Sequence, residues 1–114
     1  MAHKVFNVEH YRVSLNHELT ASWSGNIIKA RGKIVCQGDD HFLFAYFLKD
    51  NNQIPEPVYM ENDNAGAIFL PFNEMSTYID ILRNEKPVYA YLDSDKPEWI
   101  GIGSFREPVA DREN

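Results

Sequence analysis

The stretch IKARGKIVCQGDDHFLFAYFLK, residues 28–49, decides the fold. Over residues 28–37 apolar and polar side chains largely alternate, which is typical of a strand because successive strand side chains point to opposite faces. After the turn-forming residues 38–40, residues 41–49 are almost continuously apolar, as in a strand covered on both faces. The short turn predicts an antiparallel hairpin, which we expect at the centre of a sheet.

The alternation also assigns sides within the first strand of this hairpin. We expect one side to face the core, and it carries Ile28, Ala30, Gly32, Ile34 and Cys36. Cys36 is therefore predicted to be a buried and inert thiol.

Patterns on either side of the hairpin predict further short strands. Residues 9–15 alternate between polar and apolar side chains, and residues 20–26 are interpreted as a loop that Trp23 holds in place. A strand at residues 58–60 follows two prolines, which lack the amide hydrogen that a central strand donates, so we expect it at a sheet edge. The remaining predicted strands are 67–70, 88–92 and 98–105.

One amphipathic helix is predicted before the last hairpin. Its apolar stripe has the i, i+3, i+4, i+7 spacing of a helix that buries one face, and consists of Met75, Tyr78, Ile79 and Leu82. Asn73 is expected as the N-cap, and Pro87 ends the helix because the residue before a proline avoids helical backbone.

These elements predict a mainly β fold with a minority of helix. We expect a small antiparallel β-barrel or a strongly curved sheet of about seven strands, with the helix packed against it. An α+β sandwich, with one sheet face under the helix, is the alternative. With 114 residues the chain is expected to be a single domain over 1–114, in which the charged residues 106–114 form a frayed tail.

The net charge of −6 is divided unevenly along the chain. Residues 1–49 hold six basic and four acidic side chains, whereas residues 50–114 hold five basic and thirteen acidic ones. Nucleic acid is a disfavoured partner, because clustered Lys and Arg provide the affinity for phosphate. Without an apolar signal region or a membrane-length apolar run, we expect a cytoplasmic protein with no membrane partner.

A row of cations in the first hairpin strand is a candidate anion-binding site. Lys29, Arg31 and Lys33 are two residues apart, so alternation places them on one strand face, about 6–7 Å from one another. Like charges at this spacing repel weakly, and a phosphate, a carboxylate or an acidic partner surface would relieve the repulsion. The alternative is an ordinary solvated face, where each ion pair contributes about 0–1 kcal/mol.

The last predicted hairpin carries a second candidate site, for a ligand or a partner. If the opposite strand faces fill the core, one outer face gathers Tyr89, Tyr91, Trp99, Gly101, Gly103 and Phe105. Glycine within a strand often marks the close approach of a ligand or another backbone, and aromatic faces can stack a planar ligand, a base or a partner's side chain. The alternative is that the helix stripe packs here, or that the aromatic rings cover the glycines.

The sequence contains no recognisable catalytic, metal-binding or cofactor motif. No two of the four histidines have the spacing of metal ligands, and the acidic clusters at 61–64 and 93–95 are explained as turns. We therefore expect no enzymatic activity, no metal and no cofactor.

These observations favour a non-enzymatic binding or interaction module, whose partner is another protein or a second copy of itself. We expect a homodimer to form through an edge strand, such as the one near Val58, or through the aromatic face of the last hairpin. One alternative is a carrier that holds a planar or apolar small molecule in a β-barrel, and another is weak binding of single-stranded nucleic acid.

Overall fold

The computed structural model describes residues 2–49 and 54–104 and is mainly β. In these residues the elements are β1 (His3–Asn7), β2 (His10–Trp23), β3 (Asn26–Gly38), β4 (His41–Leu48), β5 (Val58–Met60), β6 (Ala65–Pro71), α1 (Met75–Asn84), β7 (Val88–Asp93) and β8 (Gly101–Ser104). Short 3-10 turns are formed by Glu61–Asp63, Phe72–Glu74 and Pro97–Trp99. The prediction of a mainly β fold with one helix before the last hairpin is confirmed.

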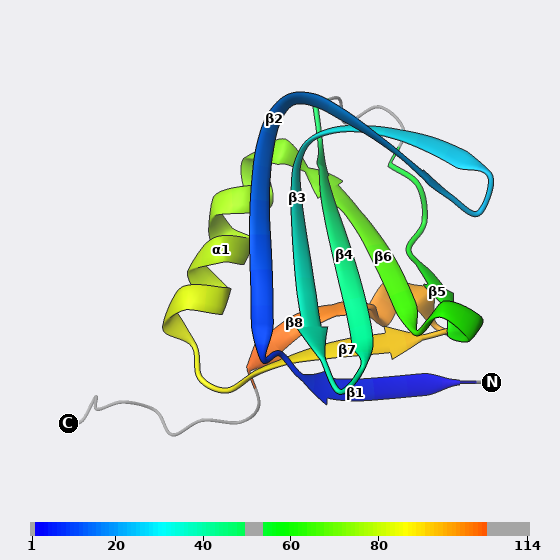
Figure 1. Cartoon of the computed structure of the whole chain (residues 1–114), viewed down its shortest axis with the longest axis vertical. Helices are drawn as coiled ribbons and strands as arrows, with labels where there is room; N and C mark the ends of the chain where they lie inside the picture. Colours follow the sequence, from blue (N-terminus) through cyan, green and yellow to red (C-terminus); the bar gives the residue numbers. More distant parts are fainter. Residues whose placement is uncertain (1, 50–53, 105–114) are drawn as a thin grey trace.

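The strands form two sheets. One has the strand order β1-β7-β8 and the other the order β2-β3-β4-β6-β5. In Figure 1 the strands of the smaller sheet run across one end of the larger sheet, and α1 packs against the larger sheet. No closed barrel is found in the described residues, whose strands form two sheets, so the expected barrel is not confirmed.

The central hairpin forms as predicted. β3 and β4 pair antiparallel through the turn at Asp39 and Asp40, both of which have positive φ, and they lie inside the five-stranded sheet. Two consecutive left-handed residues give a turn whose twist matches that of the flanking strands. β5 lies at the sheet edge, as the prolines before it predicted.

β6 departs from the expected antiparallel arrangement because it pairs parallel with β4. The apolar segment 65–70 takes the interior place between β4 and β5, and most of it is buried. The proline-preceded β5 takes the outer place and pairs antiparallel with β6 after a turn at Asn64, whose φ is 54°.

A β-bulge in β3 changes which face its side chains occupy. Ala30 lies opposite Leu48 and Gly32 lies opposite Phe47, so Arg31 is an extra residue without a partner in β4. A bulge of this kind reverses the alternation beyond it. Regular alternation predicts that Ile28, Ala30, Gly32, Ile34 and Cys36 share one face. That assignment is wrong, because Ile28 and Ala30 belong to a different buried cluster from Ile34 and Cys36.

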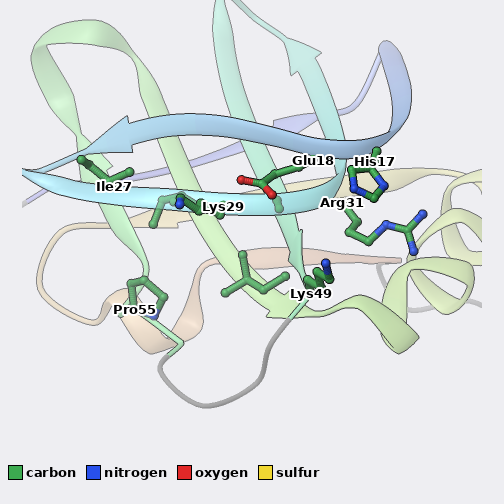
Figure 2. A pocket seen from close by; sticks show the side chains of 10 residues that line it. His17, Glu18, Ile27, Lys29, Arg31, Lys49 and Pro55 are labelled. Atoms are coloured by element: carbon green, nitrogen blue, oxygen red, sulfur yellow. The ribbon is translucent and has the colours of Figure 1, made fainter.

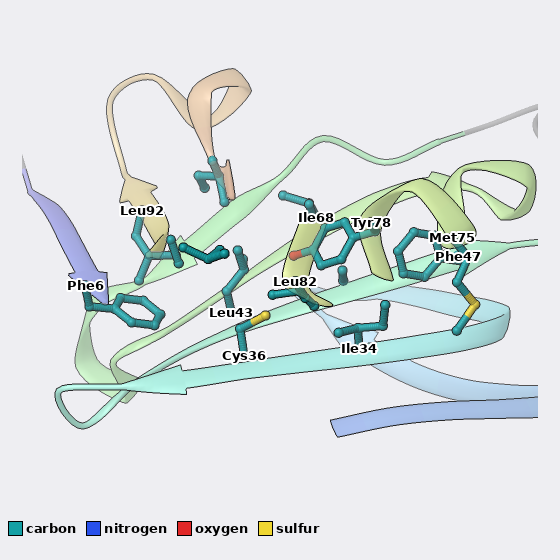
Figure 3. Packing of buried hydrophobic residues seen from close by; sticks show 14 residues of the cluster. Phe6, Ile34, Cys36, Leu43, Phe47, Ile68, Met75, Tyr78, Leu82 and Leu92 are labelled. Carbon is teal, nitrogen blue, oxygen red and sulfur yellow. The ribbon is translucent and has the colours of Figure 1, made fainter. Parts of the chain in front are cut away.

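The first cluster is the one that contains Ile34 and Cys36. It lies between α1, the five-stranded sheet and the inner side of the three-stranded sheet (Figure 3). Phe47 and Tyr78 pack edge to face with their ring centroids 5.4 Å apart. The helix begins at Met75, after the 3-10 turn Phe72–Glu74, and its N-cap position is occupied by Glu74. The expected N-cap Asn73 lies inside that turn instead, since the chain already coils one residue after Pro71.

The second cluster lies on the opposite face of the five-stranded sheet and consists of Ile28, Ala30, Tyr46, Leu48, Ala67 and Phe69. Trp23 packs against it, with its ring 5.2 Å from that of Phe44 and its Nε1–H donated to the Tyr46 hydroxyl at 2.9 Å. Residues 20–26 are not the loop predicted from their composition. β2 and β3 stay paired to a two-residue turn at Ser24 and Gly25, and so form a long hairpin arm.

Candidate functional site

The outer side of the three-stranded sheet carries an aromatic groove of about 290 Å³. In the β7–β8 pairing Tyr89 lies opposite Gly103 and Tyr91 opposite Gly101. Directly opposed residues share a sheet face, so the tyrosines stand beside the glycines. The groove is lined by Val5, Tyr89, Tyr91, Trp99, Gly101, Ile102, Gly103 and Ser104.

The structure therefore brings together five of the six residues of the predicted aromatic site. Phe105, the sixth, lies outside the described residues. The alternative in which α1 covers this hairpin does not hold for the described chain, because Val88, Ala90 and Leu92 turn the other side of β7 toward the cluster that contains α1. The ligand-binding role of the groove stays a prediction.

The floor of the groove is bare backbone. A Cβ atom placed on Gly101 or Gly103 would meet no atom of the described residues within 4 Å, and neither glycine has a positive φ. Neither steric crowding nor left-handed backbone in the described chain accounts for glycine at these two positions.

Trp99 forms one wall of the groove from a 3-10 turn rather than from a strand. Pro97 begins this turn, and the N–H of Ile100 bonds to its carbonyl oxygen at 3.0 Å, so β8 starts later than the predicted residue 98. The Trp99 side chain is 57% exposed, its ring lies 6.4 Å from that of Tyr91, and the Lys96 ammonium lies 4.8 Å from its centroid.

Asp93 fixes both the tyrosine and the turn. Its Oδ2 accepts a hydrogen bond from the Tyr91 hydroxyl at 2.8 Å, and its Oδ1 accepts the N–H groups of Asp95 and Lys96 at 2.8 and 2.9 Å. The Lys96 N–H, followed by the Tyr91 hydroxyl, holds the pKa of Asp93 below its usual value. The same carboxylate raises the pKa of Tyr91. The Asp93 carboxylate thus links Tyr91 in the groove wall to the backbone of the turn at Asp95 and Lys96.

A second, cationic pocket of about 640 Å³ lies at the β2–β3 arm (Figure 2). It is lined by His17, Glu18, Ile27, Ile28, Lys29, Ala30, Arg31, Leu48, Lys49 and Pro55. Of the predicted cation row, Lys29 and Arg31 line the pocket, whereas Lys33 does not. Lys33 lies opposite Tyr46, beyond the bulge at Arg31, so the bulge interrupts the row.

Lys49 and His17 are pocket residues that the sequence analysis missed. Both are distant in sequence from the cation row, and only the pairing of β3 with β2 and β4 brings them beside it. No local pattern of residues signals this arrangement. Anion binding stays a prediction, now for a different set of cations.

Arg31 is positioned by neighbouring groups. Its Nε–H donates a long hydrogen bond of 3.4 Å to the Asn16 carbonyl oxygen, and its guanidinium carbon lies 5.0 Å from the centroid of the Phe72 ring. Among the described residues, no carboxylate forms an ion pair with Arg31, Lys29 or Lys49, although Glu18 lines the same pocket. Among the described residues that line the pocket, the cations Lys29, Arg31 and Lys49 outnumber the single carboxylate of Glu18.

The open edge of β2 exposes an apolar row. Tyr11, Val13 and Leu15 are 37%, 44% and 62% exposed, and they lie opposite Cys36, Ile34 and Gly32 of β3. β2 forms one edge of the five-stranded sheet and β5 forms the other. Self-association through the β5 edge, near Val58, stays a prediction.

In the described part of the chain, no exposed thiol, no metal-binding cluster and no membrane-spanning helix is found. Cys36 is fully buried, and burial raises the pKa of its thiol to about 12, so it is held as a neutral thiol. No three or more His, Cys, Asp or Glu side chains are placed to hold a metal ion in residues 2–49 and 54–104. Within those residues α1 is too short and too polar to cross a membrane.

Comparison of the chain with known protein families, curated proteins and solved structures gave no match. Its function is therefore inferred from the geometry of the aromatic groove and the cationic pocket.

Proposed function

We propose that the protein is a non-enzymatic interaction module, whose aromatic groove receives a flat side chain of a protein partner. The observation that carries the proposal is the floor of Gly101 and Gly103, beside which no described atom lies within 4 Å of a Cβ position. Glycine weakens a strand by about 0.5–1 kcal/mol relative to alanine, so two open glycines call for a compensating role. Close approach of a partner to the bare backbone supplies that role.

The walls suit an aromatic or other flat guest. Trp99 is 57% exposed and its ring is tilted by 43° against that of Tyr91, so the two rings present faces of different direction to the groove. Aromatic pairs contribute about 0.5–1.5 kcal/mol beyond the area they bury, and tryptophan and tyrosine are frequent energetic centres of interfaces. The Asp93 network holds these walls before the guest arrives, which lowers the cost of ordering them.

Two observations favour a partner's side chain in the groove over a small molecule carried inside a barrel. The groove has a volume of about 290 Å³, at the lower end of the size of small-molecule sites, and it lies on the outside of the sheet. The faces of β4 are filled by their own aromatic side chains, since Phe47 packs under α1 and Tyr46 stacks with Phe69. These rings occupy the space that a carrier would need between its layers.

The test is an NMR titration with N-acetyl-tryptophan amide as a neutral, flat probe. We expect the largest shift changes at the amides of Gly101 and Gly103. Gly103→Ala places a methyl group on the floor and Trp99→Ala removes a wall, so each should weaken binding about tenfold, as expected for the loss of one interface anchor.

Leu15→Ala is the matched control, because Leu15 is 62% exposed and lies on β2, away from the groove. It should leave the affinity for the probe unchanged. Equal weakening by Leu15→Ala and Trp99→Ala, or shift changes that avoid β8, would overturn the proposal.

A further inference from the structure

We propose that the cationic pocket binds a small amphiphilic anion, in which an anionic oxygen head group is attached to a short apolar body. This site is separate from the aromatic groove, since the pocket is lined from β2, β3 and β4 of the five-stranded sheet and the groove from the three-stranded sheet. Its volume of about 640 Å³ lies within the usual range of ligand sites.

The pocket is divided into a charged end and an apolar end. Figure 2 shows Arg31, Lys49 and His17 together at one end, and Ile27 and Pro55 at the other. Glu18 lies between the two ends, and the stem of Lys29 lies beside Ile27. A ligand that is anionic at one end and apolar at the other matches this division, whereas inorganic phosphate matches only the charged end.

Arg31 is the best-placed receptor for the head group. As the extra residue of the bulge it is not constrained by a partner in β4, and bulges commonly redirect a side chain toward a site. The Asn16 carbonyl oxygen and the Phe72 ring hold its guanidinium in place. A held guanidinium binds carboxylate or phosphate oxygens in pairs, and Lys49 adds a second positive charge.

The apolar end explains an otherwise unfavourable exposure. Ile27 is 71% exposed, the largest exposure among the large apolar side chains of the described residues. It lies next to Ile28 and lines the pocket with Leu48 and Pro55. The body of an amphiphile would cover this surface, and removing apolar area from water is the main favourable term in such binding.

The test compares ligands that share one half of the amphiphile. Octanoate carries both halves, acetate only the head group and octanol only the body. By calorimetry at low salt, octanoate should bind at least about 50-fold more tightly than acetate, because each buried methylene contributes about a fourfold factor and burial of about three of its six additional methylenes reaches that value. Octanol should bind more weakly than octanoate. Octyl phosphate against octanoate then distinguishes the phosphate from the carboxylate head group.

The bulge provides a matched pair of charge variants. Arg31→Gln should weaken octanoate binding about tenfold or more, as expected for the loss of a charge-assisted contact. Lys33→Gln removes the same charge two residues further along the strand, but outside the pocket, and should change the affinity by less than about twofold. Ile27→Ser should weaken octanoate without affecting acetate.

Three results would overturn the inference. These are equal effects of Arg31→Gln and Lys33→Gln, equal affinities for octanoate and acetate, and the absence of octanoate binding at low salt. Octanoate should also leave the groove amides of Gly101 and Gly103 unshifted, so failure of this site is distinguishable from failure of the interaction module.

Discussion

The seam between the two sheets and the outer face of the three-stranded sheet use glycine in opposite ways. At the seam, a Cβ on Gly38 would overlap the carbonyl oxygen of Asn7 in β1, and a Cβ on Gly66 would come within 2.5 Å of the Leu92 Cδ2 atom in β7. On the outer face, a Cβ on Gly101 or Gly103 would meet no atom of the described residues within 4 Å. The seam glycines are thus explained by contacts within the chain, whereas no contact among residues 2–49 and 54–104 explains the outer glycines.

This difference separates glycine required by the fold from glycine that an interaction with another molecule would explain. The two roles predict opposite responses to the same substitution. Glycine to alanine should damage the seam and strengthen the outer face, although it should weaken binding there. Stability and binding measurements together therefore test whether the groove is correctly assigned.

Gly38→Ala should have the largest effect. The clash is between two backbone segments, from β1 and β3, and no side-chain rotation relieves it. We expect the free energy of unfolding to fall by about 1–3 kcal/mol or more, as for overpacked cores. Urea unfolding measures it through a lower midpoint with an unchanged slope. A variant as stable as the parent protein would show that the sheets do not meet closely at this point.

Asp93→Asn should make the free energy of unfolding of the protein less dependent on pH. The folded protein lowers the pKa of Asp93, so its carboxylate stabilises the fold above the unfolded pKa of about 3.9, and this contribution is lost as the pH falls through the lowered folded value. The stability difference between the parent protein and the variant should therefore be constant near neutral pH and shrink in acid. Urea midpoints at about pH 7 and at about pH 2 measure it. A difference of equal size at both values contradicts the assigned network.

Gly103→Ala should have the smallest effect on stability, and it should be favourable. Its backbone is not left-handed and the added methyl group meets no described atom, so alanine costs nothing in the folded state. The unfolded chain loses freedom, which raises the free energy of unfolding by about 0.5–1 kcal/mol. Thermal or urea unfolding detects this gain. Destabilisation would mean that the space beside Gly103 is occupied within the chain.

The aromatic groove was largely readable from the sequence because it depends on regular alternation. Tyr89, Tyr91, Gly101 and Gly103 have the period-two spacing that places residues on one strand face, and the turn between the strands preserved that relationship. Trp99 also lines the groove, but not as the strand residue that was predicted. It lies in the 3-10 turn that begins at Pro97.

The cationic pocket was only partly readable because it depends on an irregularity. The alternation of strand side chains predicts Lys29, Arg31 and Lys33 as one row. In the structure the bulge at Arg31 separates Lys33 from the other two. A bulge has no strong signature in composition, and the neighbours Lys49 and His17 are brought in by strand pairing over a distance. The parallel pairing of β6 with β4 was missed for a similar reason, since strand order is not encoded in local pattern.

The bulge at Arg31 changes the sheet face on which all following side chains of β3 lie. Before it, β3 delivers Ile28 and Ala30 to one buried cluster, and after it the same strand delivers Ile34 and Cys36 to the other. Substitution of Arg31 changes a charge, whereas its deletion would move the side chains of one part of β3 to the opposite sheet face. Every apolar side chain on one side of the deletion would then face the wrong layer, so this single position sets how one strand serves both hydrophobic clusters.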